Sequence, residues 1–184
     1  RRACLSGSTS GRTGCMKELP ELPCELYDLS VWLLGIDEHL CYAATLEILA
    51  RRDHAVLEVE QKLARTGYRR ASIEAAVERA QQHRFLNDDR FSDYFIRERV
   101  QRGWGRRKIE LELKRRGIDA AMLPGYPESY FSREDDLARA SALLARKRIP
   151  ERDPYPKLKR FLMGKGFDYA VAAQAARDRL DADS

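Results

Sequence analysis

Apolar residues recur at intervals of three and four along most of the chain after residue 41, which is the spacing of one face of an α-helix. The segment SIEAAVERAQQ (72–82) shows this pattern, with apolar residues at its second, fifth, sixth and ninth positions. Phe91, Tyr94 and Phe95 form an aromatic stripe with the same spacing. Because valine and isoleucine are few, a large sheet is not expected, and the pattern predicts an all-α fold.

The helical pattern repeats itself. Similar segments occur three times, as QKLARTGYRRASI (61–73), LELKRRGIDAAML (111–123) and RFLMGKGFDYAVA (160–172). Each contains a leucine, three residues, a glycine and an apolar residue, and the glycines lie 50 and 49 residues apart. Self-similarity at this period is typical of a helical array in which neighbouring repeats share their packing.

Residues that begin and end helices stand at matching places in these segments. The glycine allows the left-handed backbone conformation that commonly ends a helix. Asp119 and Asp168 each follow that glycine by two residues and are predicted to cap the next helix. Asp53 and Ser72 are predicted to cap helices in the first repeat. Each repeat is therefore interpreted as three helices, the second of which ends at the glycine.

The predicted architecture is three tandem three-helix repeats in an extended, curved array, behind a disordered N-terminal tail. The repeats are assigned to residues 41–84, 85–130 and 131–184, and residues 1–40 to a disordered or irregular extension. The first 25 residues are rich in Gly, Ser, Thr and Pro and show no period. The chain begins with arginine, and whether residues 1–15 are a fragment end or an upstream extension stays open.

Positive charge is concentrated in two stretches. The formal net charge is +5, but residues 97–118 carry +6 and residues 139–165 carry +7, whereas residues 1–40 carry −2. Such concentration favours a polyanion or an acidic protein surface as the partner. A solvated helix face explains either stretch alone equally well.

Four cysteines, at positions 4, 15, 24 and 41, form no C-x-x-C pair, so we interpret them as free thiols of a reducing compartment. The most apolar run, VWLLGI (31–36), is too short for a membrane span. RRACLSGSTSGRTG at the start lacks the apolar region of a signal peptide. These features predict a cytoplasmic protein without a membrane partner.

The aspartate pair Asp88–Asp89 could bind a metal ion, as in a nuclease, or begin a helix. Asn87 or Asp88 makes a good N-cap, and Asp89 would then lie in the first turn, near the positive end of the helix. No H-E-x-x-H, G-x-S-x-G or metal-spaced His/Cys set accompanies the pair. His54, four residues before Glu58, is interpreted as half of a surface helix pair. We predict no catalytic residue, no metal ligand, no cofactor and no enzymatic activity.

The segment FLNDDRFSDYFIRERVQRGWGRRKIELELKRRGI (85–118) resembles the RecX family, the regulators of the RecA recombinase, and the likeness extends over about residues 44–180. The residues that carry it here, with the matching last repeat, and that we expect to be structural, are Asp88, Asp89, Arg90, Phe91, Gly105, Ile109, Leu113, Gly117, Gly166 and Phe167. MLPGYP (122–127) departs from the family pattern, and proline should end the sixth helix near Leu123. Residues 1–40 have no identified counterpart.

The resemblance implies a monomer that binds RecA, or its filament on single-stranded DNA, and inhibits filament growth, ATP hydrolysis, strand exchange and co-protease activity. It would thereby modulate recombination, DNA repair and the SOS response. The candidate RecA or DNA contacts are Arg97, Arg99, Arg102, Trp104, Arg106, Arg107, Lys108, Arg115, Arg116, Arg146, Lys147, Arg148, Lys157, Lys159 and Arg160. Trp104 is either a surface for base stacking or a hydrophobic anchor between repeats. A stand-alone basic helical protein that binds nucleic acid directly is the alternative.

Overall fold

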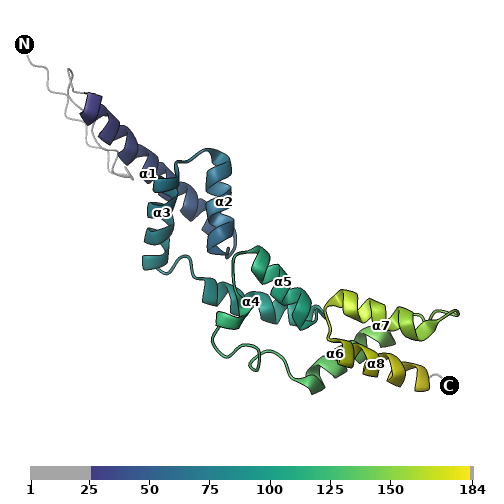
Figure 1. Ribbon diagram of the computed structural model, residues 1–184. Helices are drawn as coiled ribbons and strands as arrows, with labels where there is room; N and C mark the ends of the chain where they lie inside the picture. Colours follow the sequence, from purple (N-terminus) through teal and green to yellow (C-terminus); the bar gives the residue numbers. More distant parts are fainter. Residues whose placement is uncertain (1–25, 183–184) are drawn as a thin grey trace, which may run out of the picture.

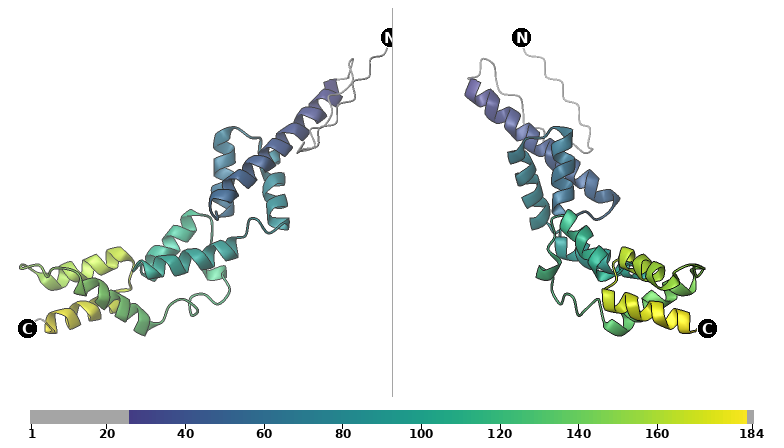
Figure 2. Two further views of the ribbon diagram at one scale, coloured as in Figure 1. Left: turned by 180° about the vertical axis from the view of Figure 1, so that it is seen from behind. Right: turned by 45° about the vertical axis from the view of Figure 1, so that its right-hand side comes forward.

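The computed structural model describes residues 26–182, and within this range it contains eight α-helices, one 3-10 helix and no strand. The helices form three packed units in an extended row that bends along its length (Figures 1 and 2). The first unit holds α1 (Leu26–Arg51), α2 (Val56–Thr66) and α3 (Arg70–Gln82). The middle unit holds α4 (Asp88–Gln101), α5 (Arg106–Arg115) and the 3-10 helix η1 (Ala120–Met122). The last unit holds α6 (Arg133–Ala145), α7 (Pro154–Lys165) and α8 (Tyr169–Asp181).

Each unit has its own small hydrophobic core. Val59, Leu63 and Val77 are among the core residues of the first unit, Ile96 and Leu113 of the middle unit, and a third cluster fills the last unit. The all-α helical-repeat prediction is confirmed. The division at residues 84/85 and 130/131 stays a prediction.

The predicted irregular extension over residues 1–40 is wrong for its last part, because α1 already begins at Leu26. Residues 26–40, LYDLSVWLLGIDEHL, contain no proline and a single glycine, which a helix tolerates at a cost of about 1 kcal/mol. The helix then continues without interruption into the segment whose periodicity was evident. Residues 1–25, including three of the cysteines, lie outside the described residues, and the predicted tail with them.

The three predicted glycine stops are confirmed. Gly67, Gly117 and Gly166 have φ values of +99°, +78° and +95°, in the left-handed region that favours glycine. Gly67 and Gly166 directly follow the last residues of α2 and α7, and Gly117 follows the end of α5 by two residues.

The predicted N-caps are partly wrong. Asp119 does cap η1, because its side chain accepts a hydrogen bond from the backbone of Ala121. Asp168 stands at the N-cap of α8 without a capping bond. Asp53 lies outside α2, whose first residue follows Ala55. Ser72 is inside α3, where its hydroxyl donates to Asp37 of α1 and ties the two helices together.

The third helix of the middle unit is short, and a loop completes its packing. The helical conformation ends at Met122, next to Leu123, as the following proline predicted. Tyr126, Tyr130 and Phe131 from the loop then pack against the middle core. The two tyrosines donate hydrogen bonds of 2.8 Å to Glu110 and Asp93, which hold the loop on α5 and α4. This aromatic loop takes the place of helical packing in the middle unit.

Candidate functional site

The aspartate pair at the start of α4 is divided between two roles. Asn87 is the N-cap of α4 and accepts from the backbone of Arg90 at 2.8 Å. Asp88 instead reaches back to the first unit, where its Oδ1 accepts from the backbone N–H of Val56 at 2.9 Å, at the start of α2. Burial raises the pKa of the Asp88 carboxyl above its ordinary value. Asp89 is exposed, whereas Asp88 is half-buried against the first unit.

Arg90 and Phe91 complete this contact between the first and middle units. The Arg90 guanidinium pairs with Asp53 at 2.9 Å and donates to the carbonyls of Arg84 and Phe85 at 3.2 Å. Phe91 is buried and stacks on Phe95, with ring centroids 5.7 Å apart. Tyr94, predicted in the same stripe, is 66% exposed, because the turn of the helix carries it past the core face. The DDRF sequence therefore joins two units.

A second set of contacts strengthens the same joint. Glu58 on α2 pairs with Arg116 at the end of α5 at 3.2 Å, and Arg116 also pairs with Glu112 at 2.8 Å. Leu57 lies against Gly117, where an added Cβ would be 3.1 Å from it. We call these contacts, with those of Asp88 and Arg90, the first–middle joint. Sequence reasoning missed Glu58 in this role, since no local spacing links it to a residue 58 positions away.

His54 lies between Asp53 and Ala55, two residues that contact the middle unit, and it corrects an expectation. It is 3% exposed and precedes α2, so it is not half of a surface helix pair. Its Nδ1 lies 2.9 Å from the carbonyl of Arg52, and its Nε2 lies 2.6 Å from Nζ of Lys62. Since a carbonyl accepts and an ammonium donates, the proton of the neutral ring belongs on Nδ1. Burial lowers the pKa of His54.

The joint between the middle and last units is made by backbone. The N–H of Gly105 donates to the carbonyl of Lys165 at 2.9 Å, and the N–H of Arg107 donates to the carbonyl of Gly166 at 3.0 Å. A Cβ on Gly105 would lie 2.3 Å from backbone atoms of Gly166 and Phe167, and one on Gly166 would lie 2.4 Å from Lys108. The absence of side chains at these two glycines thus allows the middle–last joint to form.

A ladder of alternating cations and aromatic rings connects the two joints along α4 and α5. Arg116 lies over Phe95 at 4.8 Å, and Arg99 lies between Phe95 at 4.8 Å and Trp104 at 4.9 Å. Lys108 covers the other part of the Trp104 ring at 4.0 Å. Trp104 also packs against the middle core, so its ring is in contact with protein on several sides. This geometry favours the anchor interpretation of Trp104, with cation–π attraction adding to its burial.

The candidate cations of the middle unit are largely neutralised. All of them except Lys108 make an ion pair. The pairs are Arg97 with Asp93, Arg99 and Arg102 with Glu98, Arg106 with Glu110, Arg107 with Asp168, Arg115 with Glu112, and Arg116 with both Glu58 and Glu112. Most join residues three or four positions apart on one helix, which is typical of a solvated helix face.

The candidate cations of the last unit differ, since among residues 26–182 only Arg148 of this set has an ion-pair partner. The others are Arg146, Lys147, Lys157, Lys159 and Arg160, which we call the last-unit cation group. Lys147 lies over Phe161 at 4.3 Å, and Lys159 lies between Tyr155 at 5.2 Å and Tyr169 at 4.7 Å. An aromatic ring attracts an ammonium without cancelling its charge. This group can therefore attract an anionic partner.

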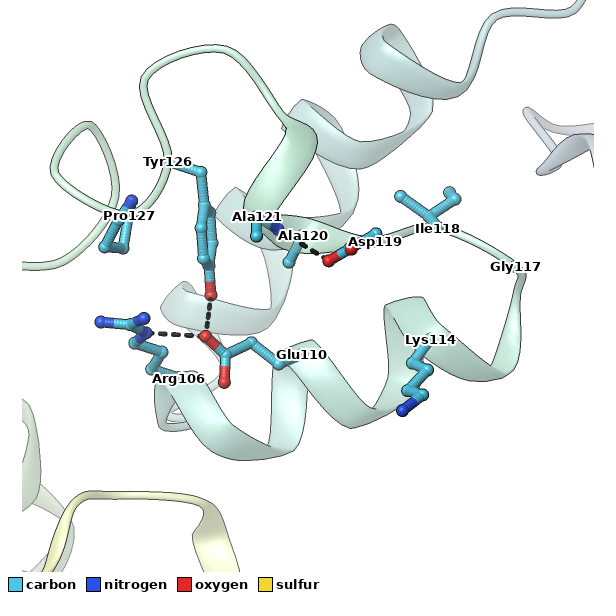
Figure 3. Close-up of a pocket in the computed structure, with 10 residues that line it drawn as sticks. All are labelled: Arg106, Glu110, Lys114, Gly117, Ile118, Asp119, Ala120, Ala121, Tyr126 and Pro127. Atoms are coloured by element: carbon cyan, nitrogen blue, oxygen red, sulfur yellow. Dashed lines mark hydrogen bonds and ion pairs between the residues drawn. The ribbon is translucent and has the colours of Figure 1, made fainter.

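A hollow of about 670 Å³ lies beside α5 and η1, and Figure 3 shows its lining. Glu110 points into it, accepting from the Tyr126 hydroxyl at 2.8 Å and from Arg106 at 2.7 Å. The carboxylate of Glu110 is therefore satisfied by two donors from the lining of the hollow. Among residues 26–182, no group of three His, Cys, Asp or Glu side chains is arranged to hold a metal ion.

Comparison with known proteins identifies the family. Residues 41–79 match a family model described as the first three-helix domain of RecX, and residues 87–122 match the second three-helix domain. The regulatory protein RecX of Vibrio campbellii is 38% identical over 133 residues, which cover 68% of this chain and 83% of that protein. The chain belongs to the RecX family. The RecX of Halorhodospira halophila is 35% identical over 144 residues, covering 75% of this chain and 88% of the relative.

Solved RecX structures share the fold. The crystal structure of RecX from Lactobacillus salivarius superimposes with a TM-score of 0.66 at 20% identity, covering 79% of this chain and 97% of the other. A second crystal structure of regulatory protein RecX gives a TM-score of 0.69 at 17% identity, covering 84% and 79%. The predicted membership is therefore confirmed, and with it the assignment to a family of regulatory proteins.

The RecX second-domain match contains most of the residues that build the two joints. It begins at Asn87 and includes Asp88, Arg90 and Gly105. The first-domain match begins at Cys41, so residues 26–40 of α1 precede it. No helix in the described part of this RecX chain combines the length and the apolar character of a membrane span.

Proposed function

We propose that this chain binds the RecA recombinase, free or as its filament on single-stranded DNA, and inhibits filament growth. ATP hydrolysis, strand exchange and co-protease activity would fall with it. Membership in the RecX family of regulatory proteins is the observation that carries the proposal. The chain acts in the cytoplasm, as a monomer, by binding and without catalysis of its own.

The shape of the molecule supports this mode of action. Three small units in an extended row can contact several subunits of a filament at once (Figure 1). Each contact can be weak, because the joints hold the other units near their own sites and raise the effective concentration. The first–middle joint and the middle–last joint keep the units at fixed relative positions, so the row works as a shaped surface.

The last-unit cation group is our candidate for the strongest electrostatic contact. Its five members make no ion pair with the described acidic residues. Two of them directly follow α6 and three lie in α7, in the unit at one end of the row. They can meet either acidic side chains of the recombinase or phosphates of the single strand. If all five contacted phosphates, log affinity would fall with log salt concentration at a slope of about −3.5.

Titration of the purified chain into RecA filaments on single-stranded DNA tests the proposal. We expect ATP turnover to fall as the chain is added, with half-maximal inhibition at fewer chains than RecA subunits. Filaments pre-assembled with a non-hydrolysable ATP analogue should retain the chain in co-sedimentation. Unchanged turnover at saturating chain would contradict the proposal.

Direct nucleic-acid binding as a stand-alone activity is the second candidate. The last-unit cation group favours it, since charges without carboxylate partners are available for phosphate. Salt-sensitive binding of single-stranded DNA, together with no effect on recombinase ATP turnover, would identify this activity in place of the first.

A further inference from the structure

A second hollow, of about 540 Å³, lies between the end of α4 and one face of α6, where the middle unit meets the last unit. Leu143 of α6 lies against Gly103, where an added Cβ would be 3.0 Å from it, so the two units are in contact here. Three arginines are among the lining residues. Arg102 directly follows α4, Arg139 lies in α6, and Arg146 directly follows α6. We call this space the arginine hollow.

Helical spacing brings the two arginines of the last unit to the same hollow. Arg139 and Arg146 are seven residues apart, which is close to two turns, and Arg146 keeps right-handed helical backbone angles. Leu143 stands between them on the same face of the helix. Arg102 comes from the middle unit. The arginine hollow is therefore complete only when the middle and last units are in contact.

The lining of the arginine hollow contains no carboxylate. Four other hollows among residues 26–182 each have at least one aspartate or glutamate in their lining. Beside the arginines, the lining here consists of apolar side chains, Gly103 and the neutral amide of Gln101. Such a lining attracts an anion and offers no negative charge that would oppose it.

The ion pair of Arg102 does not cancel the positive charge on the α4 side of the hollow. Arg102 shares the carboxylate of Glu98 with Arg99, so two guanidinium groups pair with one carboxylate. The pair engages one nitrogen of the Arg102 guanidinium. Because this group carries five N–H donors, it can still donate to a ligand.

The α6 side of the hollow has one paired and one unpaired arginine. Arg139 pairs with Asp136 through a single nitrogen and lies over the Phe131 ring at 5.8 Å, so its side chain is held in place. Arg146 is exposed and has no ion-pair partner among the described residues. With Arg99 included, four arginines face two carboxylates, which leaves an excess of two positive charges.

We propose that the arginine hollow binds backbone phosphates of a single-stranded nucleic acid. Clustered arginines suit phosphate, because a planar guanidinium donates two parallel hydrogen bonds to its oxygens. Arg146 and the adjacent Lys147 belong to the last-unit cation group, so a strand that leaves the hollow meets further unpaired cations. A strand with one phosphate per nucleotide can occupy both. The proposal rests on the proposed function in one respect, which is that a polyanion meets the last-unit cation group, and it names that polyanion.

Binding of a labelled oligothymidylate strand to the full chain, followed by fluorescence anisotropy without recombinase, tests the proposal. Arg139→Gln and Arg146→Gln should each weaken binding about tenfold, which corresponds to the loss of one charge-assisted hydrogen bond. The slope of log affinity against log salt concentration should become shallower by about 0.7 in each variant. Arg146 has no described ion-pair partner, so Arg146→Gln should keep the unfolding midpoint and stays informative if Arg139→Gln is destabilised.

Arg133→Gln is the matched control. Arg133 is exposed on the same helix and makes no ion pair with the described residues, but it does not line the arginine hollow. The variant removes the same charge as the two test variants. Because the charge lies away from the hollow and is screened by salt, its removal should weaken strand binding by less than about twofold.

Several results would overturn the proposal. Unchanged affinity in Arg139→Gln and Arg146→Gln would show that no phosphate enters the hollow, and an equal loss in Arg133→Gln would assign binding to diffuse charge. Polyglutamate that displaces the strand at equal charge concentration would point to an acidic protein surface. Tighter binding of pyrophosphate than of the strand would assign the hollow to a small phosphate ligand. Because recombinase is absent, each of these results leaves the proposed inhibition of ATP turnover to its own titration.

Discussion

The middle and last units carry similar amounts of positive charge in sequence but use it differently. In the middle unit, arginines form ion pairs with carboxylates on the same helix or at a joint. These carboxylates neutralise the positive charge of the arginines within the protein. In the last unit, Lys147 and Lys159 lie against aromatic rings, and Arg146 and Arg160 make no ion pair with the described residues. Charge in a sequence is therefore a poor guide to charge on a surface.

In the proposed function, this difference separates the parts that fix the shape from the part that faces a partner. Ion pairs between helix neighbours contribute only about 0.3–0.5 kcal/mol each, so the paired arginines act mainly by neutralising local charge. The unpaired cations keep their charge and can attract anions over distances of about 10 Å at moderate salt. Four sets of variants test the joints and this division of charge, from the largest expected effect to the smallest.

Gly105→Ala should disrupt the middle–last joint and so separate the middle unit from the last unit. Its Cβ would lie 2.3 Å from backbone atoms of Gly166 and Phe167, and neither backbone can rotate away as a side chain could. We expect a loss of about 3 kcal/mol in the free energy of unfolding, measured by urea denaturation, and a larger radius of gyration in small-angle X-ray scattering.

Gly67→Ala is the control for Gly105→Ala. Gly67 has a φ of +99°, whereas Gly105 has a φ of −84°, but nothing lies within 4 Å of the Cβ position of Gly67. Gly67→Ala should lower the free energy of unfolding by only about 1 kcal/mol, which is the cost of a left-handed backbone for alanine. Its radius of gyration should equal that of the unsubstituted chain. Equal losses in both variants would mean that the middle–last joint contributes no steric constraint.

The triple variant Arg146→Ala, Lys157→Ala, Arg160→Ala should weaken binding to the RecA filament about thirtyfold, which is ~2 kcal/mol, at moderate salt. All three residues are exposed and make no ion pair with the described residues, so the unfolding midpoint should not change. Titration of ATP turnover measures the loss.

Three paired arginines provide the matched comparison: Arg97→Ala, Arg106→Ala, Arg115→Ala removes the same charge from the middle unit. Its effect on filament binding should be several times smaller, because each carboxylate left behind was already neutralising its arginine. If the two triple variants lost equal affinity, the division between the units would be wrong.

The repeat was predictable because its signals are local. A glycine at the end of a helix is required by backbone geometry, so Gly67, Gly117 and Gly166 were visible at their near-equal spacing. The stop before Pro124 follows equally from the chemistry of a single residue. The start of α1 was missed because the residues before it are rich in Gly and Pro. The predicted irregular extension was therefore continued to residue 40, past the true start of the helix.

The joints could not be predicted from one sequence, because their partners are distant. Asp88 was expected near the start of its own helix, yet it bonds to Val56, 32 residues earlier. Asp53 was expected to cap α2 and pairs with Arg90 instead. The sequence also did not show which cations lack an ion-pair partner, because the net charge of a segment does not reveal which side chains are in contact. Three aromatic residues in a proline-containing linker were the one available sign of the loop that packs on the middle unit.

Asp88→Ala should cost about 1–2 kcal/mol of unfolding free energy, because the first N–H of α2 loses its acceptor. Asp88→Asn keeps an acceptor oxygen and removes a carboxylate that burial disfavours, so it should cost less than half as much. Asp89→Ala, at the exposed neighbour, is the control and should change stability by under about 0.5 kcal/mol. Urea denaturation at neutral pH distinguishes the three. Equal losses in the Ala and Asn variants would argue for a role of the Asp88 charge in place of its hydrogen bond.

The smallest effect concerns pH and tests whether stability depends on the charge state of His54, in the segment that leads into α2. Burial lowers the pKa of His54 from the ordinary 6.5, so the unfolded chain binds the proton more readily than the folded one. Stability should therefore rise with pH through the window just below 6.5 and level off above it. Protonation of Nε2 would also place a second positive charge 2.6 Å from Lys62.

His54→Asn does not titrate but retains a donor for the Arg52 carbonyl, so it should flatten this rise in a series of urea melts between about pH 5.5 and 8. His39→Asn, at an exposed histidine of α1, should leave the rise unchanged. If the free energy of unfolding still rises with pH in His54→Asn, the pH dependence would be assigned to the carboxylates.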